Sequence, residues 1–303
     1  MSTPPHLQLP ARARRLEIPV TRGSRAAVEI APDDPEGTAV LIPGFTGSKE
    51  DFIALLEPLA GHGWRVVAYD QLGQWESIGP DNDDAYRLAA LGADAGDVAA
   101  WAATTSGHAV HLVGHSLGGL VARSAIVDAG ATTVDAVTLL CSGPGALPAH
   151  RHGTIPALVA VLPDMPLADI WVAKEAMDRD AGWEPPSPEV YDFLRARFCA
   201  VNPWSLREMG RILLDEPDRT DLLAAADVIT HVVYGEHDDA WPTEEQDAMA
   251  AALGVVPRVI PGASHSPAVD DPATTAALLD RLWRDCRARR DSRARRDSRA
   301  RRD

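Results

Sequence analysis

Short apolar runs alternate with helical patterns over most of the chain. Six runs rich in apolar and β-branched residues predict buried strands, at 38–42, 65–69, 109–113, 134–140, 228–234 and 255–260. Between them, apolar residues recur at helical spacing, as at Phe52, Leu55 and Leu59, and predict helices at 52–59, 84–105, 117–129, 243–253 and 272–286. Two earlier runs, 16–20 and 26–30, flank a turn and predict a hairpin. This alternation indicates an α/β fold with a mostly parallel sheet covered on both faces by helices.

The alternation is interrupted between residues 144 and 222. This segment contains many prolines and three tryptophans, shows no clean strand, and has helical patterns at 167–177 and 190–198. We therefore expect a helical insertion at 144–222 in an α/β core formed by residues 1–143 and 223–286. With 303 residues, the chain has the size of one large domain that carries such an insertion.

The last part of the chain, residues 287–303, differs from the rest in composition. It repeats the hexapeptide RARRDS and contains nine Arg and three Asp, a net charge of +6. Since the whole chain carries −15, the preceding residues carry −21. The repeat has no large apolar side chain to bury, which predicts a disordered tail. A basic arm for acidic partners or membrane surfaces is one interpretation of this tail, and simple repeat expansion is the one that we favour.

Composition and charge exclude several classes of protein. The acidic body argues against nucleic-acid binding, because it would repel a phosphate backbone. The three cysteines are far apart and indicate neither disulfides nor zinc, and the pair His150 and His152 has no carboxylate cluster beside it, so we expect no metal. No apolar run is long enough to span a membrane, and the N-terminal residues lack the apolar centre of a secretory signal. We expect a soluble protein of the cytoplasm.

The segment Gly114-His115-Ser116-Leu117-Gly118 has the pattern G-x-S-x-G. It directly follows the predicted strand 109–113 and opens the predicted helix 117–129, which is the context that a reactive serine on a sharp turn requires. Such a turn brings backbone close to both sides of the serine, and Gly114 and Gly118 leave room for it. The pattern predicts Ser116 as a nucleophile, and an ordinary glycine-rich turn is the less favoured alternative.

A serine nucleophile needs a base, and the base needs an orienting carboxylate. Because α/β sheets place their sites at the carboxyl ends of strands, the base should follow a strand, and His265 follows the run 255–260. The acid should follow the run 228–234, where Glu236, Asp238 and Asp239 are available. We select Asp238, with Asp239 as a close rival and Glu236 as the third choice. The order Ser116, Asp238, His265 is the nucleophile, acid and base order of one particular fold.

Two backbone amides are candidates for stabilising the oxyanion of a tetrahedral intermediate. The amide of Leu117 lies at the start of the helix that follows the serine. The amide of Phe45 lies in the glycine-containing loop 43–48 that follows the predicted strand 38–42. Each such donor typically contributes about 10²–10³ in rate, so this loop is expected to be central to the site.

The segments PGFTGSKEDF, GHSLGG, GEHDDAWP and GASHSP together resemble the α/β-hydrolase superfamily, in particular its lipase/esterase-like members with a helical cap. The resemblance covers the chain except for the tail. It implies the α/β-hydrolase fold, with Ser116, Asp238 and His265 as catalytic residues and the amides of Phe45 and Leu117 as the oxyanion hole. It also implies that residues 144–222 form a cap or lid over the substrate pocket.

The loop 70–77 resembles the D-x-x-G-x-G-x-S turn of this family but departs from it at Trp75, where glycine is usual. A tryptophan there would make the rim of the site bulkier. Trp75, Trp171 and Met165 are our candidates for the substrate pocket. Packing within the cap is the competing interpretation of Trp171 and Met165.

The resemblance implies acyl transfer without a cofactor. A small-molecule substrate is expected, namely a small or medium carboxylic ester with an apolar acyl group, and the acidic body does not favour anionic substrates. Carbon–carbon bond hydrolases, thioesterases and perhydrolases use the same three residues and stay open as alternatives. An alternative of another class is a ligand-binding homologue without catalysis, which would not need all three residues.

Overall fold

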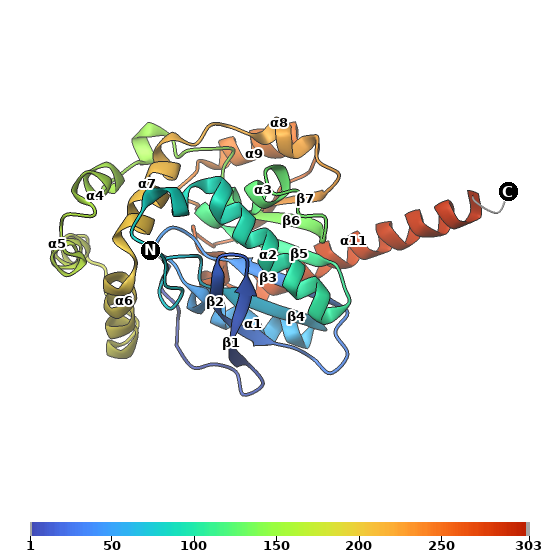
Figure 1. The fold of residues 1–303 in the computed structure, drawn as a ribbon, viewed down its shortest axis with the longest axis horizontal. Coiled ribbons are helices and arrows are strands. Elements are labelled where there is room, and N and C mark those ends of the chain that lie inside the picture. Colours follow the sequence, from blue (N-terminus) through green and yellow to red (C-terminus); the bar gives the residue numbers. More distant parts are fainter. Residues whose placement is uncertain (1, 301–303) are drawn as a thin grey trace.

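Eight strands form one continuous sheet in the order β1-β2-β4-β3-β5-β6-β7-β8 (Figure 1). The computed structural model describes the backbone of residues 2–300 and the side chains of residues 2–288. The hairpin strands β1 and β2 pair antiparallel, as do β2 and β4, whereas all later neighbours are parallel. The strands are β1 (Arg14–Val20), β2 (Gly23–Ile30), β3 (Gly37–Ile42), β4 (Trp64–Tyr69), β5 (Val110–His115), β6 (Val134–Leu140), β7 (Ile229–Gly235) and β8 (Arg258–Ile260).

The direction of strand addition reverses at β3. From β3 the chain crosses to β4 on one side, and it then returns to β5 on the other side of β3. Loops that leave the sheet at such a reversal diverge, and they leave a crevice at the carboxyl ends of the strands. The loop 43–48 follows β3 and the turn with Ser116 follows β5, so both segments of the expected site lie at this crevice.

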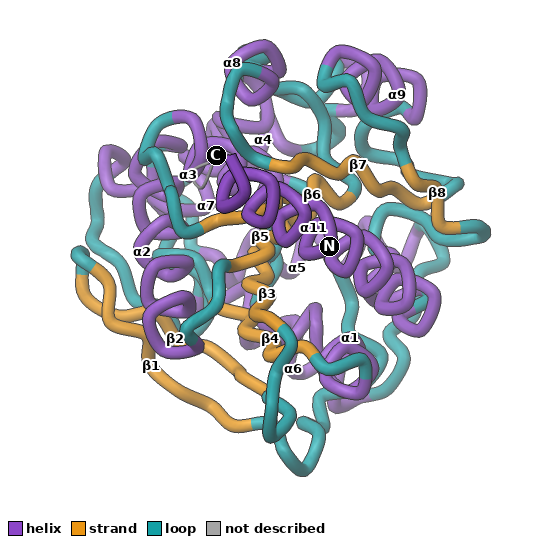
Figure 2. The backbone as a smooth tube through the Cα atoms, turned by 90° about the vertical axis from the view of Figure 1, so that its right-hand side faces the viewer, coloured by secondary structure: helices purple, strands orange, loops and turns teal. Residues whose placement is uncertain are grey.

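Helices cover both faces of the sheet (Figure 2). On one face α1 (Ile53–Gly61) packs against α11 (Pro272–Ala300), and on the other α2 (Leu88–Ser106) packs against α3 (Leu117–Val127). Strands β3, β4 and β5 are buried along their whole length, as in other sheets covered on both faces. The other elements here are η1 (Lys49–Phe52), η2 (Asp83–Tyr86), α8 (Thr220–Ala224), α9 (Thr243–Ala252) and α10 (Pro267–Asp270). No helix within the described residues has the length and apolar character to span a bilayer.

The segment between β6 and β7 is helical and lies at one side of the sheet (Figure 1). Its helices α5 and α6 correspond to the two helical patterns found in the sequence, whereas α4 and α7 were not predicted. Prolines stand in the first turns of α4, α6 and α7, where the missing amide hydrogen costs nothing, so residues that interrupt the strand pattern begin helices here. The elements are η3 (Ala149–Arg151), α4 (Ile155–Val161), α5 (Leu167–Asp180), α6 (Pro188–Ala200) and α7 (Pro203–Asp215).

Two segments differ from the sequence-based expectation. The strand expected at 255–260 is reduced to β8, because Pro257 directly precedes it and has no amide hydrogen for pairing. The helix expected to end at residue 286 continues to Ala300, through most of the tail for which we expected disorder. Alanine and arginine are strong helix formers, and Arg287 pairs with Glu36 at 2.8 Å, which together favour the continuation of α11. Residues 301–303 lie outside the described residues.

Candidate active site

Ser116 is the single residue between β5 and α3. Its backbone has φ 57° and ψ −125°, a combination that residues other than glycine rarely adopt. A Cβ atom at Gly114 would lie 2.1 Å from the carbonyl oxygen of Gly118, and one at Gly118 would lie 2.4 Å from the carbonyl oxygen of Ile42. The turn therefore requires glycine at both positions, and it presents the serine at the carboxyl end of the sheet.

Two hydrogen bonds join Ser116, His265 and Asp238. The Ser116 hydroxyl lies 3.0 Å from Nε2 of His265, and Nδ1 of His265 lies 2.8 Å from Oδ1 of Asp238. His265 is in the loop between β8 and α10, and Asp238 is in the loop between β7 and α9. When Nδ1–H donates to the carboxylate, Nε2 is left free to accept the serine proton. The structure thus brings together the three residues that the sequence pattern selects.

The geometry distinguishes Asp238 from the two other acidic candidates. Asp238 is buried, and its carboxylate also accepts hydrogen bonds from a backbone amide at 3.0 Å and from the side chain of Gln246 at 2.9 Å. Asp239 is exposed, and Glu236 accepts a hydrogen bond from the backbone amide of Gly262 in the loop after β8. Burial opposes the charge on Asp238, but His265 and the other donors outweigh it and hold the pKa of Asp238 below its usual range.

His115 holds His265 from the end of β5. Its Nε2 donates to the backbone carbonyl oxygen of His265 at 2.7 Å, and the two ring centroids are 5.0 Å apart. Burial, together with the neighbouring His265, lowers the pKa of His115 to about 3, so this imidazole stays neutral near pH 7. Sequence reasoning gave His115 no function, although its place directly before Ser116 at a strand end was the available signal.

The loop 43–48 lies directly beside Ser116. A Cβ atom at Gly44 would lie 3.1 Å from Cβ of Ser116, so glycine permits this approach. The hydrogen bonds among the described residues leave the amides of Phe45 and Leu117 without an acceptor. Both amides are therefore available to an oxygen atom placed near the serine hydroxyl.

Two buried glutamines hold the carbonyl side of this loop. The side-chain amide of Gln71 donates to the carbonyl of Pro43 at 2.8 Å, and that of Gln74 donates to the carbonyls of Gly44 at 2.8 Å and Phe45 at 3.2 Å. In a trans peptide the amide hydrogen points away from the preceding carbonyl oxygen. Gln74 therefore fixes the direction of the Phe45 amide. Sequence reasoning missed both glutamines, although the resemblance of the loop 70–77 to a family turn pointed to their segment.

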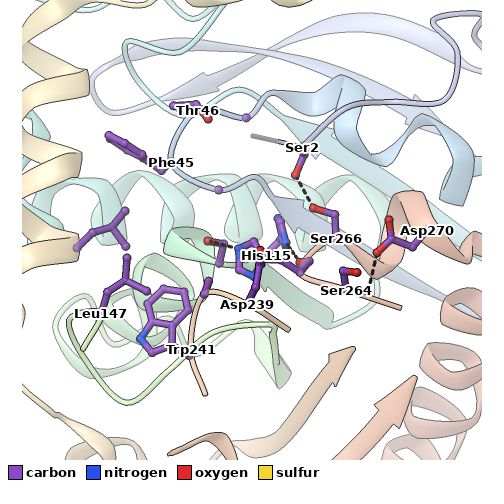
Figure 3. Close-up of a pocket in the computed structure, with 16 residues that line it drawn as sticks. Ser2, Phe45, Thr46, His115, Leu147, Asp239, Trp241, Ser264, Ser266 and Asp270 are labelled. Atoms are coloured by element: carbon purple, nitrogen blue, oxygen red, sulfur yellow. Dashed lines mark hydrogen bonds between the residues drawn. The ribbon is translucent and has the colours of Figure 1, made fainter. Parts of the chain in front are cut away.

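Ser116, His265, His115 and residues 44–47 line one cavity of about 350 Å³ (Figure 3). Phe45, Leu147 and Trp241 lie on one side of the close-up, and Ser2, Ser264, Ser266 and Asp270 lie on the other. The apolar part of the lining is formed by Phe45, Leu147, Leu213 and Trp241. The polar side chains include Ser2, Thr46, Ser264, Ser266, Asp239 and Asp270.

The three pocket residues expected from the sequence are absent from the described residues that line this cavity. Trp75 packs edge-on against Phe193 of α6, with ring centroids 5.5 Å apart, and its φ of 40° explains why glycine is usual there. Trp171 is buried in the apolar cluster of α5 and α6, and Met165 is 40% exposed. The expectation was wrong because the inserted helices bury these side chains against one another or leave them on the surface.

One group of metal-binding residue types is found among the described residues, formed by Cys141, Asp238 and His265. Its donors are already engaged, because both carboxylate oxygens of Asp238 accept hydrogen bonds and one of them binds His265. Burial, with Asp238 nearby, raises the pKa of the Cys141 thiol well above its usual value. Asp238 and His265 of this group are thus held in the hydrogen-bonded chain that ends at Ser116 rather than arranged as metal ligands.

The strand order, the serine turn after β5 and the His and Asp loops after β8 and β7 define an α/β hydrolase. The sequence agrees, because residues 39–278 match the model of the alpha/beta hydrolase family. The chain belongs to this family.

Solved structures of similar fold include hydrolases of more than one type. An esterase from Thermogutta terrifontis superposes with a TM-score of 0.68 and 22% identity, over 90% of this chain and 99% of that one. An N-acyl homoserine lactonase superposes with a TM-score of 0.71 and 21% identity, over 90% of this chain and 98% of that one. At such identities the likeness shows the fold.

One curated relative matches part of the sequence. A 2-succinyl-6-hydroxy-2,4-cyclohexadiene-1-carboxylate synthase from Enterobacter sp. (strain 638) is 39% identical over 72 residues, which is 24% of this chain. The match spans about a quarter of the length of that relative, 26%.

Proposed function

We propose that the protein hydrolyses a carboxylic ester through an acyl-enzyme on Ser116. The observation that carries this proposal is the hydrogen-bonded chain from Asp238 through His265 to Ser116, which opens into a cavity of about 350 Å³. A reactive serine needs a base within hydrogen-bond reach and a carboxylate that fixes the tautomer of that base. Both requirements are met by side chains that follow β7 and β8, at the same edge of the sheet as Ser116 after β5.

In the first half of the reaction, Nε2 of His265 takes the proton of Ser116 while the serine oxygen attacks the carbonyl carbon of the ester. The negative charge that develops on the carbonyl oxygen is stabilised by the amides of Phe45 and Leu117, which act as an oxyanion hole. His265 then gives its proton to the leaving alcohol, and the carbon–oxygen bond to that alcohol breaks. Asp238 keeps its negative charge and stabilises the imidazolium that forms.

In the second half, a water molecule takes the place of the alcohol. His265 removes a proton from this water as the water oxygen attacks the acyl carbon, and the same two amides stabilise the second oxyanion. The intermediate then releases Ser116, which receives its proton back from His265. The carboxylic acid leaves and the starting enzyme is restored.

The cavity supports a small or medium ester with an apolar acyl group. Phe45, Leu147, Leu213 and Trp241 provide an apolar wall beside the serine. We assign the helical segment 144–222 to a cap over this wall, since Leu147 and Leu213 belong to it. A cavity of this size is at the lower end of the range for small-molecule sites.

The nucleophile is tested with a fluorophosphonate probe, which forms a covalent bond with an activated serine. The protein should be labelled, and Ser116→Ala should abolish the labelling. Ser264→Ala is the matched control, because this serine lines the same cavity and should leave the labelling intact. Labelling of the Ser116→Ala variant at the rate of the native protein would overturn the assignment.

The bond that is cleaved is tested with a panel of substrates of matched acyl chains. p-Nitrophenyl esters of increasing chain length, a lactone, a thioester and a vinylogous diketone distinguish an esterase from a thioesterase or a carbon–carbon bond hydrolase, and peroxide added to the ester tests perhydrolase activity. We expect kcat/KM to be highest for the oxygen esters. Labelling by the probe without turnover of any of these substrates would favour the alternative of a ligand-binding homologue.

A further inference from the structure

Arg197 of α6 is fully buried and joins three separate parts of the chain. One of its terminal nitrogens donates to Oδ1 of Asp51 at 2.6 Å and lies 3.2 Å from the hydroxyl of Ser48. The other donates to the backbone carbonyl of Ser2 at 2.8 Å. The inserted helices, the N-terminal residues and the segment after loop 43–48 therefore meet at one guanidinium group.

The Asp51 side chain supports the loop that carries the Phe45 amide. Its Oδ2 accepts a hydrogen bond from the amide of Ser48 at 3.3 Å, which closes the end of this loop. A Cβ atom at Gly47 would lie 2.4 Å from the same oxygen, so the carboxylate lies directly against the turn. That turn is closed by a hydrogen bond from the Gly47 amide to the Gly44 carbonyl at 3.2 Å. A shift of Asp51 would thus move the backbone beside Phe45.

Ser2 forms a second wall of the cavity. Its hydroxyl lies 3.0 Å from the hydroxyl of Ser266, which is the neighbour of His265 in the sequence. Figure 3 shows this contact between Ser2 and Ser266 as a dashed line at one side of the cavity. By holding the carbonyl of Ser2, Arg197 fixes this wall without lining the cavity itself.

Stability alone is a poor explanation for this buried arginine. Burying a guanidinium and a carboxylate costs desolvation free energy, and apolar residues of similar size often stabilise a fold as well or better. The Nε of Arg197 lacks a hydrogen-bond partner among the described residues, so the group is not fully satisfied. What the guanidinium provides, and an apolar side chain would not, is directional contact both with Asp51, which supports the loop 43–48, and with Ser2, which lines the cavity.

We propose that Arg197 is a positioning residue that couples the inserted helices to the Phe45 amide and to the Ser2 wall. This inference rests on the proposed function, because it assigns the loop 43–48 to the oxyanion hole. Arg197 acts through Asp51 and Ser2, and it does not contact the substrate. Loss of its contacts leaves Ser116 and His265 in place but lets the Phe45 amide drift from the developing oxyanion.

The test separates positioning from stability with a pair of variants. Arg197→Met leaves Asp51 as an unpaired buried charge, and it should lower both the unfolding midpoint and kcat. Arg197→Met combined with Asp51→Asn removes both charges, and it should recover most of the unfolding midpoint. In this double variant, kcat and the rate constant of fluorophosphonate labelling should stay reduced by about tenfold or more, with KM within about twofold, because a misplaced oxyanion donor acts in the transition state.

Arg207→Met is the matched control. Arg207 of α7 also joins the inserted helices to the remaining chain, through three hydrogen bonds to Asp83 at 3.1, 2.8 and 2.7 Å, but it does not line the cavity. It should change the unfolding midpoint without a comparable loss of kcat. If the double variant regains kcat and the labelling rate together with its unfolding midpoint, Arg197 has a structural role only and the inference is overturned. Absence of labelling in the native protein would instead contradict the proposed function.

Discussion

The hydroxyl of Ser116 lies 3.0 Å from Nε2 of His265, although the two residues are 149 positions apart in the sequence. His265 is fixed from two directions. Its ring is held by Asp238 at Nδ1, and its backbone carbonyl accepts a hydrogen bond from His115 at 2.7 Å. A base that is held before the substrate arrives loses little freedom during the reaction, so the residues that hold it should affect the rate as well.

Replacement of the acid provides the first prediction. Asp238→Asn should lower kcat by about 10³–10⁴, because an amide at this position favours the wrong tautomer of His265. Asp239→Asn should stay within about twofold of the native kcat, because this side chain is exposed and does not contact the base. Both are measured with a p-nitrophenyl ester, with unfolding midpoints as a check of the fold. A greater loss in Asp239→Asn than in Asp238→Asn would reverse the assignment.

The glutamines behind loop 43–48 provide the second prediction. Gln74→Met should lower kcat by about tenfold to a hundredfold with little change in KM, because the Gly44 carbonyl loses the shorter of its two hydrogen bonds and keeps only that from the Gly47 amide, so the Phe45 amide is held less firmly. Gln71→Met is the control, since Gln71 holds the Pro43 carbonyl and so the preceding peptide. Its effect on kcat should be clearly smaller. Equal losses in the two variants would show that the loop responds as a whole and that Gln74 has no special part in orienting the amide.

The contrast between Ser116 and Trp171 shows what the sequence could predict. Ser116, His265 and the Phe45 loop were found because each directly follows a strand, and strand ends in an α/β sheet converge at one edge. The position of each residue directly after a predicted strand is enough for that inference. The choice between Asp238 and Asp239 was open because adjacent residues in a loop point in different directions, which only their hydrogen bonds decide.

Properties that depend on packing between distant segments were missed. Trp171 was assigned to the pocket, yet it is buried among the inserted helices, because its neighbours Tyr191 and Phe198 come from another helix whose position the sequence does not specify. Arg197 was not predicted for the same reason, because its partners Asp51 and Ser2 lie 146 and 195 positions away in the sequence. The prolines of the insertion were interpreted as interruptions, although in α4, α6 and α7 they begin helices.

The lowered pKa of His115 gives the third prediction, on stability against pH. The pKa of this histidine is about 3 in the folded protein and 6.5 in a free side chain. Its contribution to stability is therefore complete above about pH 6.5 and is lost as the pH falls toward 3, by about 1.4 kcal/mol per pH unit, because only the unfolded chain binds the proton in that range.

The variant His115→Gln removes this titration and keeps a side-chain donor for the His265 carbonyl. Between pH 6.5 and 5 the native protein should lose about 2 kcal/mol more unfolding free energy than the variant. The measurement is urea unfolding of both proteins at each pH. Since all other titrating groups are shared, parallel curves for the two proteins would show that His115 is not kept neutral by the fold.

The charges around the cavity give the fourth prediction, on substrate preference. The charged side chains among the described lining residues, apart from the imidazoles, are the carboxylates of Asp239 and Asp270, and neither lysine nor arginine occurs in that set. An ester that carries a carboxylate is repelled by both, whereas a neutral ester of the same size is not. We expect kcat/KM for the neutral ester to exceed that for the anionic one, with a difference that shrinks as salt is added.

Asp239→Asn should raise kcat/KM for the anionic ester by about threefold to tenfold and leave the neutral ester nearly unchanged. The reason is that repulsion between one exposed carboxylate and a nearby anionic group of the substrate costs about 1 kcal/mol. The effect should appear in KM more than in kcat, since the removed repulsion acts on substrate and transition state alike. A native protein that prefers the anionic ester would contradict this prediction, and it would indicate a cationic group that reaches the cavity when substrate binds.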